Sequence, residues 1–193
     1  MLPGAFLVGS VIASGTTLAA TPSASMLANT CAGCHGTNGS SVGPASPTIA
    51  GISPDYFVES MEAYRTGERP STIMTRIAKG YTDEEIKLMA DFFAKQPFVR
   101  QPQKYDAKKA QMGKSLHKKY CEKCHEDGGR SAEDDAGILA GQWAPYLGFM
   151  MDDFTSGRRE MTKKMKKKVG ELQAEHGDAG VEALVNYYAS QAK

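Results

Sequence analysis

Apolar residues recur at helical spacing along most of the chain, and no convincing run of strands interrupts them. The clearest stretch follows Thr82-Asp83-Glu84-Glu85, where Thr with Glu three positions later is the pattern of a helix capping box. The stripe behind it comprises Ile86, Met89, Ala90 and Phe93. This spacing predicts an amphipathic helix with one face in a core.

Other stripes predict further helices. Ser53-Pro54 places Pro in a first helical turn. The stripe behind it is Phe57, Met61 and Tyr64, and a twin after Pro145 holds Leu147, Met150, Met151 and Phe154. Asp178 is expected to cap a last helix with the stripe Val181, Leu184, Val185 and Tyr188. The fold class expected from these stripes is all-α, and the helical methionines, Met61, Met89, Met150 and Met151, are expected in the core.

The second half of the chain repeats the first at an offset of 90 residues, which becomes 95 near the end. Pairs of residues at equivalent places in the two copies are register mates. Those at offset 90 include Gly39/Gly129, Ala50/Ala140, Gly51/Gly141, Tyr56/Tyr146 and Arg69/Arg159. Two prolines in 96–106 indicate a linker. We expect domains at 21–98 and 108–193, joined by 99–107.

The first 20 residues have the character of a secretory signal. Leu2 to Ala20 carry no charge and end in small residues, so 1–20 is expected to be a signal peptide, cleaved after Ala20. A membrane anchor is the alternative, which Pro3 and several glycines and serines weaken. With a net charge of +1, the 193-residue chain offers no bulk electrostatic case for binding nucleic acid or membranes.

All four cysteines lie in two copies of Cys-x-x-Cys-His, at 31–35 and 121–125. This is the attachment signature of c-type haem, in which the cysteines form thioethers and the histidine ligates the iron. The sequence predicts two covalent haem c groups, held by Cys31, Cys34 and His35 and by Cys121, Cys124 and His125. Two disulfides or a zinc site are alternatives, but neither explains a histidine after each pair. Together with the expected signal, this places the protein in the periplasm.

A second axial ligand is expected if the iron is to carry electrons, commonly methionine sulfur. Met74 is the candidate for the first haem, 43 residues after Cys31. For the second, exact register gives Lys164, so Met165 is preferred and Met161 is the alternative. His117 is expected to be a surface or hydrogen-bonded residue, and His176 to lie in a solvated loop.

Differences between the copies predict unequal haem potentials. Pro44 is expected to offer its carbonyl to Nδ1 of His35, and the second half has no proline at this place. Trp143 is expected to pack against the second haem. A basic cluster of Lys163, Lys164, Lys166, Lys167 and Lys168 is either a solvated face or a partner surface.

The chain resembles the dihaem cytochromes c4 and, more closely, the cytochrome subunits of flavocytochrome c sulfide dehydrogenases. The resemblance spans 21–193 and rests on Ser41–Ala50, Ser71–Tyr81, Tyr120–His125 and Leu139–Trp143, although the loop Ser131–Gly137 is shorter than in that family. It implies two tandem class I cytochrome c domains. It also implies a partner flavoprotein that carries FAD and oxidises sulfide, and a soluble cytochrome c as electron acceptor.

Three functions follow as hypotheses: an electron-transfer subunit of such a sulfide-oxidising complex, a free dihaem carrier of the cytochrome c4 type, and a haem enzyme such as a peroxidase. Met74 and Met165 disfavour the third, which needs an open iron position. No catalysis is expected from this chain alone, because it has neither a spare cysteine nor a nucleotide-binding glycine motif.

Overall fold

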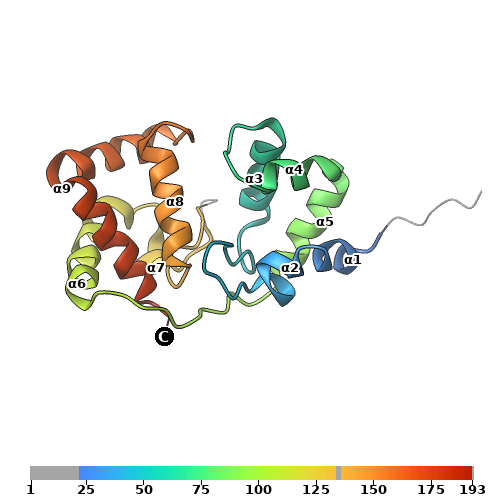
Figure 1. Ribbon diagram of the computed structural model, residues 1–193, viewed down its shortest axis with the longest axis horizontal. Coiled ribbons are helices and arrows are strands. Elements are labelled where there is room, and N and C mark those ends of the chain that lie inside the picture. Colours follow the sequence, from blue (N-terminus) through green and yellow to red (C-terminus); the bar gives the residue numbers. More distant parts are fainter. Residues whose placement is uncertain (1–21, 134–135, 193) are drawn as a thin grey trace, which may run out of the picture.

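The computed structural model describes residues 22–133 and 136–192, and every regular element in that part of the chain is helical. The expected signal at 1–20 lies outside the described residues. Two groups of helices stand side by side, joined by an extended segment along one edge (Figure 1). The all-α prediction is therefore confirmed for the described residues.

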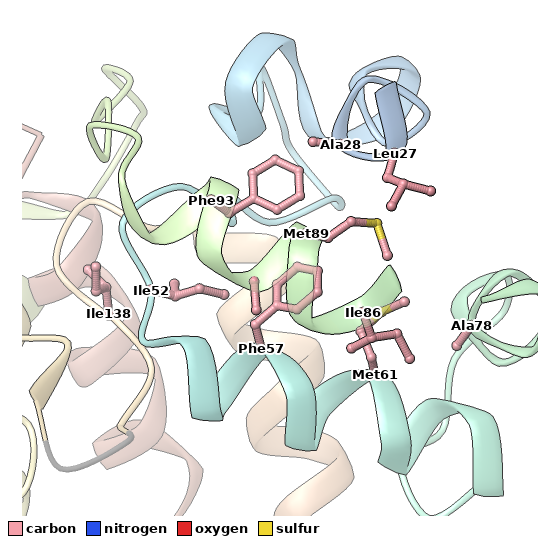
Figure 2. Packing of buried hydrophobic residues seen from close by; sticks show 11 residues of the cluster. Leu27, Ala28, Ile52, Phe57, Met61, Ala78, Ile86, Met89, Phe93 and Ile138 are labelled. Atoms are coloured by element: carbon pink, nitrogen blue, oxygen red, sulfur yellow. The ribbon is translucent and has the colours of Figure 1, made fainter. Parts of the chain in front are cut away.

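The first half places a middle helix and a terminal helix against two short N-terminal helices. Its elements are α1 (Ala24–Asn29), α2 (Ala32–His35), η1 (Thr37–Gly39), α3 (Pro54–Thr66), α4 (Met74–Ile77), η2 (Ala78–Gly80) and α5 (Asp83–Ala94). Figure 2 shows the aromatic rings of Phe57 and Phe93 facing each other in the core, 5.6 Å between centroids, with Met89 and Ile86 beside them. This core holds the hydrophobic stripes that the sequence predicts.

The second half repeats this plan with a longer last helix. Its elements are α6 (Ala107–Leu116), the π-helical turn η3 (His117–Cys121), α7 (Glu126–Gly129), α8 (Ala144–Thr155) and α9 (Lys163–Ala189). Helix α9 occupies the place of α4, η2 and α5 together and contains a break at Gly177, whose φ of 57° is not helical. The core of the second half comprises Leu116, Tyr120, Leu147, Leu172, Ala183, Leu184, Tyr187 and Tyr188.

The repeat is visible in individual hydrogen bonds. The carbonyl of Gly39 accepts from Ile49 and Ala50, and the carbonyl of its register mate Gly129 accepts from Leu139 and Ala140. Both glycines have positive φ, 81° and 88°, which is accessible to Gly at little cost. A second pair shows the offset change, because Gly51 N donates to Phe93 O and Gly141 N to Tyr188 O.

The predicted helix starts are present in detail. The Thr82 hydroxyl accepts from the backbone N–H of Glu85 at 3.2 Å, and the Glu85 carboxylate accepts from the N–H of Thr82 at 2.8 Å, which completes the capping box. Ser53 caps α3 by accepting from Tyr56 N, with Pro54 in the first turn. In both cases the local sequence alone specifies the cap.

Several predictions about residues on the helices are wrong, and one of them concerns Met151, which is half-buried and not part of the second core. His176 lies within α9, half-buried with its ring edge-on to Tyr120, because the chain stays helical up to the break at the next residue. Met150 is not in the core: its sulfur accepts hydrogen bonds from two arginines, both at 3.4 Å. Among the helices of the described ranges, none is both long and apolar enough to cross a membrane.

Candidate functional site

Each Cys-x-x-Cys-His motif folds into a single helical turn. In the first, the carbonyl of Cys31 accepts from the N–H of Cys34 at 3.2 Å and of His35 at 2.9 Å. In the second, the carbonyl of Cys121 accepts in the same way from Cys124 and His125 at 3.1 and 3.0 Å. Residues three apart on a helix share a face. The two thiols of each motif therefore point to one side, as double attachment to a planar ring requires.

The cysteines are free thiols, and the two pairs lie in separate halves. No disulfide joins any of the four. Within residues 22–133 and 136–192, no three His, Cys, Asp or Glu side chains come together as a metal-binding group. Burial raises the pKa of Cys31, and that of Cys121 to about 11, so both sulfurs stay protonated at neutral pH. The geometry favours neither the disulfide nor the zinc alternative.

The imidazole of His35 is oriented by the carbonyl of Pro47, not by that of Pro44 as the sequence suggests. Nδ1 lies 2.8 Å from Pro47 O. The intervening loop turns back on itself, because the Ser41 hydroxyl accepts from Gly43 N at 2.9 Å and donates to Ser46 O at 2.7 Å. Burial lowers the pKa of His35, and the Pro47 carbonyl opposes this. Nδ1 is thus the donor, which leaves Nε2 to bind iron.

His125 has a weaker support in the second half. Burial lowers its pKa, and the backbone of Gly137 partly offsets this effect. Nδ1 of His125 nonetheless has no hydrogen-bond partner of ordinary geometry. Gly137 is the register mate of Pro47, so the same position supplies the carbonyl in both halves with different quality. This difference supports the expectation that the two sites are unequal.

The candidate sixth ligands both lie in the first turn of a helix. Met74 is the first residue of α4 and packs, partly buried, against the core that also contacts Cys31. Met165 is half-buried in the first turn of α9, where its N–H is capped by the Thr162 hydroxyl at 3.3 Å. Met161 is also half-buried and precedes that cap. Met74 and Met165 remain predictions as iron ligands.

His117 is hydrogen-bonded, as expected, but it is not at the surface. The side chain is 1% exposed and Nδ1 lies 2.9 Å from the Tyr188 hydroxyl. Nε2 lies 2.5 Å from a Glu122 carboxylate oxygen, outside the geometry of an ordinary hydrogen bond. The ring sits between helices behind the second motif, so it serves packing and polar support.

Residues of the second half hold the loop that supports His35. Gln142, 3% exposed, accepts from Thr48 N at 3.0 Å and donates to Thr48 O at 2.9 Å. Trp143 donates from Nε1 to Ser41 O at 3.3 Å. A Cβ added at Gly43 would lie 2.3 Å from the Trp143 ring, so this ring lies against the first half. Packing of Trp143 against the second haem stays a prediction, and the role of Gln142 was not predicted from the sequence.

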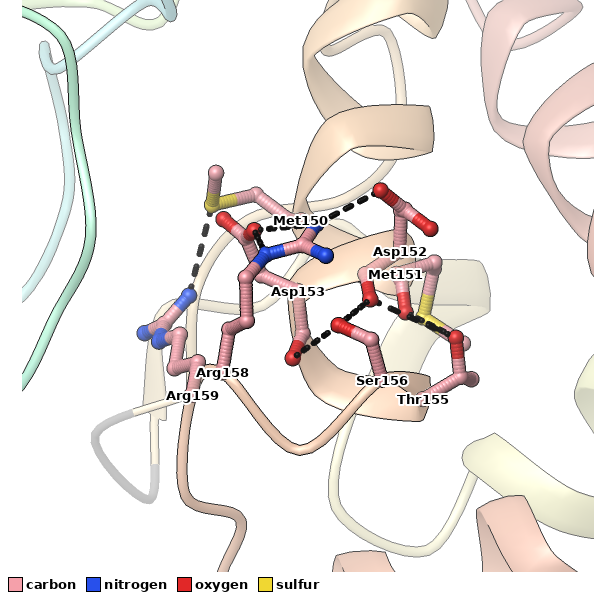
Figure 3. A network of polar contacts seen from close by, with 8 residues as sticks. All are labelled: Met150, Met151, Asp152, Asp153, Thr155, Ser156, Arg158 and Arg159. Carbon is pink, nitrogen blue, oxygen red and sulfur yellow. Dashed lines mark hydrogen bonds and ion pairs between the residues drawn. The ribbon is translucent and has the colours of Figure 1, made fainter.

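Two arginines and two tyrosines, all register mates, meet between α3 and α8. Arg69 donates to the hydroxyl of Tyr146 at 2.8 Å, and Tyr56 interacts with both Arg69 and Arg159. Burial raises the pKa of Tyr56, but the two guanidiniums lower it by more. Figure 3 shows Arg159 directed at the sulfur of Met150. These bonds join the halves across a polar seam.

The basic cluster occupies the first two turns of α9, and all of its lysines are exposed. Lys168 pairs with Glu171 at 2.7 Å. Positive charge at a helix N-terminus opposes the helix dipole, so this arrangement costs helix stability. The geometry leaves both readings of the cluster open.

Pro47 and Gly137 are register mates, but no sequence motif marks either as the residue next to a proximal histidine. Free thiols on one face, with an imidazole oriented through Nδ1, form a donor set that fits covalently attached haem.

Comparison with known proteins points the same way. The sequence model of the family described as cytochrome c matches residues 20–96. The cytochrome subunit of sulfide dehydrogenase from Chlorobaculum tepidum is 48% identical over 35% of this chain, and the alignment spans 61% of that subunit. Cytochrome c4 from Thiocapsa roseopersicina is 30% identical over 67% of this chain and 71% of its own length. The crystal structure of cytochrome c4 from Pseudomonas stutzeri superposes with a TM-score of 0.74 at 24% identity, covering 87% of this chain and 96% of that one.

Proposed function

The chain belongs to the cytochrome c family, and on that basis we propose that it is a periplasmic dihaem electron-transfer subunit. Its partner would be an FAD-containing flavoprotein that oxidises sulfide, and its acceptor a soluble cytochrome c. Bound haem iron supplies the one-electron redox chemistry. The observation that carries the proposal is the pair of equivalent Cys-x-x-Cys-His turns, each with free thiols on one face.

The chain's own residues would attach, orient and cover the two groups. Cys31 and Cys34 in one half, and Cys121 and Cys124 in the other, would form the thioethers. The second-ligand roles of Met74 and Met165 fit their half-buried positions in a first helical turn. His35 and His125 are the proposed proximal ligands, and His35 is buried while His125 is half-buried.

Similarity to the sulfide dehydrogenase subunit supports the choice of partner. A specific observation also favours the second candidate, a free carrier of the cytochrome c4 type: the cytochrome c4 alignment extends over 67% of the chain, about twice the share aligned with the sulfide dehydrogenase subunit. Both functions share the haem sites, and they differ in whether a flavoprotein stays bound.

A pull-down of the tagged chain from native periplasm separates the two candidates. Visible spectra and mass analysis of the eluate would report haem content and any bound flavin. We expect two haems per chain and a flavoprotein in equal amount. Sulfide added to this complex should reduce the haems. A lone low-spin dihaem protein that sulfide does not reduce would favour the free carrier.

Single substitutions test the axial ligands. Met74→Ala and Met165→Ala are each expected to convert one of the two haems to a high-spin form that binds carbon monoxide when reduced. Met61→Leu, a core substitution in α3, is the control and should leave both spectra unchanged. If Met161→Ala produces the effect and Met165→Ala does not, the ligand of the second haem is Met161.

A further inference from the structure

The peptide unit between Pro47 and Thr48 is held at both ends. Its carbonyl oxygen lies 2.8 Å from Nδ1 of His35, and its N–H donates to the side-chain oxygen of Gln142 at 3.0 Å. His35 belongs to the first half and Gln142 to the second. One peptide therefore links a side chain of the second half to the proximal histidine of the first.

Burial makes this chain of hydrogen bonds effective. Thr48 and Gln142 are each 3% exposed, and His35 is 8% exposed. In a low-dielectric interior, successive hydrogen bonds polarise one another and each becomes stronger. A bond accepted from the N–H of a peptide draws electron density toward its carbonyl oxygen. The Gln142 amide thus makes the Pro47 carbonyl a better acceptor for the His35 N–H.

The amide orientation is set by its surroundings. The Gln142 side chain donates to Thr48 O at 2.9 Å, so its nitrogen faces that carbonyl and its oxygen faces the Thr48 N–H. The same oxygen also accepts from Trp143 N at 3.1 Å. Thr48 is anchored further, because its hydroxyl accepts from Ser41 N at 3.2 Å. At the Pro47–Thr48 peptide, the Gln142 side chain can therefore act only as the acceptor for the Thr48 N–H.

The second half lacks this arrangement. The register mate of Thr48 is Ile138, and that of Gln142 is Ile52, so the equivalent place holds an apolar side chain. Both isoleucines are buried in the core of the first half. Nδ1 of His125 correspondingly has no partner of ordinary geometry. The chain of hydrogen bonds from Gln142 therefore reaches His35 and has no counterpart at His125.

We propose that Gln142 is a positioning residue that strengthens the Pro47–His35 hydrogen bond across the junction and so lowers the reduction potential of the first haem relative to the second. The proposal rests on the proposed haem sites. A stronger acceptor at Nδ1 raises the basicity of the imidazole, and a more basic ligand stabilises ferric over ferrous iron. Docking of the second half thereby sets the potential of the first.

The test uses the holoprotein and the variant Gln142→Met, which keeps the side-chain length and removes the acceptor. Redox titration followed by NMR of the two proximal histidines assigns each potential to its haem. Loss of one hydrogen bond is expected to change the ferric-to-ferrous ratio of the first haem about threefold. That is an increase of about 28 mV in its midpoint potential, with the second haem unchanged. The His35 Nδ1–H resonance should move upfield.

Gln103→Met is the matched control, because Gln103 donates to Gln142 O at 2.9 Å and accepts from Ala144 N at 2.8 Å without touching Thr48. Gln142→Glu separates polarisation from loop anchoring, since it keeps the acceptor and loses the donor. It should not raise the potential, and it also serves if Gln142→Met fails to fold.

Three results would overturn the proposal. The midpoint potential of the first haem could rise equally in Gln142→Met and Gln142→Glu, or the potentials of both haems could shift equally. The third is a shift in the potential of the first haem no larger than in the Gln103→Met control. Haem content decides which idea has failed. A purified chain without two haems contradicts the proposed function. A dihaem chain whose first potential ignores Gln142 contradicts this inference alone.

Discussion

Helix α6 packs against α9 at Gly113 without room for a side chain. A Cβ built on it would lie 2.0 Å from the carbonyl oxygen of Ala183 and 2.7 Å from the Cβ of Tyr187. The first contact is with the backbone of α9, so a change of side-chain rotamer cannot relieve it. Gly113→Ala must therefore push apart the two helices that flank the second haem motif.

Two effects of opposite sign set the magnitude. Alanine is favoured over glycine inside a helix by about 1 kcal/mol. Overpacking a close-packed contact costs about 1–3 kcal/mol, and a 2.0 Å approach to backbone belongs at the upper end of that range. We expect a net loss of about 2 kcal/mol in the free energy of unfolding, which lowers the Tm of a half of this size by about 8–16 °C.

Urea titration of the holoprotein by far-UV circular dichroism measures this loss. The control is Gly148→Ala in α8, where an added Cβ meets nothing within 4 Å. Only the propensity effect then remains, and a gain of up to about 1 kcal/mol is expected. The reasoning fails if Gly113→Ala stabilises the protein as much as the control does.

Three further substitutions test local interactions. Thr82→Ala removes the hydroxyl that caps α5 and should cost about 1 kcal/mol in urea titration; an unchanged midpoint would show that the capping bond to Glu85 contributes nothing. Burial lowers the pKa of His117 in the folded chain. Below its unfolded pKa of about 6.5 the unfolded state therefore binds a proton that the folded state does not, and stability should fall from pH 7.5 to 5.5. His117→Asn should flatten that dependence, and an equal slope in both proteins would count against it. Gln142→Ala leaves the N–H and the C=O of Thr48 buried without partners and should cost about 1–3 kcal/mol for each group; calorimetry showing an unchanged Tm would contradict this.

Local features of the fold were predictable because neighbouring residues determine them. The capping box at Thr82 and the Pro-initiated start of α3 involve bonds across only a few positions. The repeat also predicted equivalent contacts in the two halves, since Gly39 and Gly129 accept the same pair of hydrogen bonds. The helix stripes, the all-α class and the helical haem motifs all belong to this group.

Contacts between the halves were not predictable from pattern. Nothing in the stripe of α8 distinguishes Leu147, which enters the core, from Met150, which accepts hydrogen bonds from arginine. The carbonyl that orients His35 was assigned three residues too early, because the Ser41-centred turn of the loop has no signature in the sequence. Periodicity says which face is apolar, but not which neighbour that face meets.

The polar seam between α3 and α8 is close to symmetric. Arg69 of the first copy donates to Tyr146 of the second, and Arg159 of the second copy interacts with Tyr56 of the first, so the same four register mates meet from both sides. In two identical subunits, such reciprocity is the mark of an isologous interface around a two-fold axis. The symmetry of the seam does not extend to the neighbouring junction, where Gln142 of one copy has Ile52 as its register mate in the other.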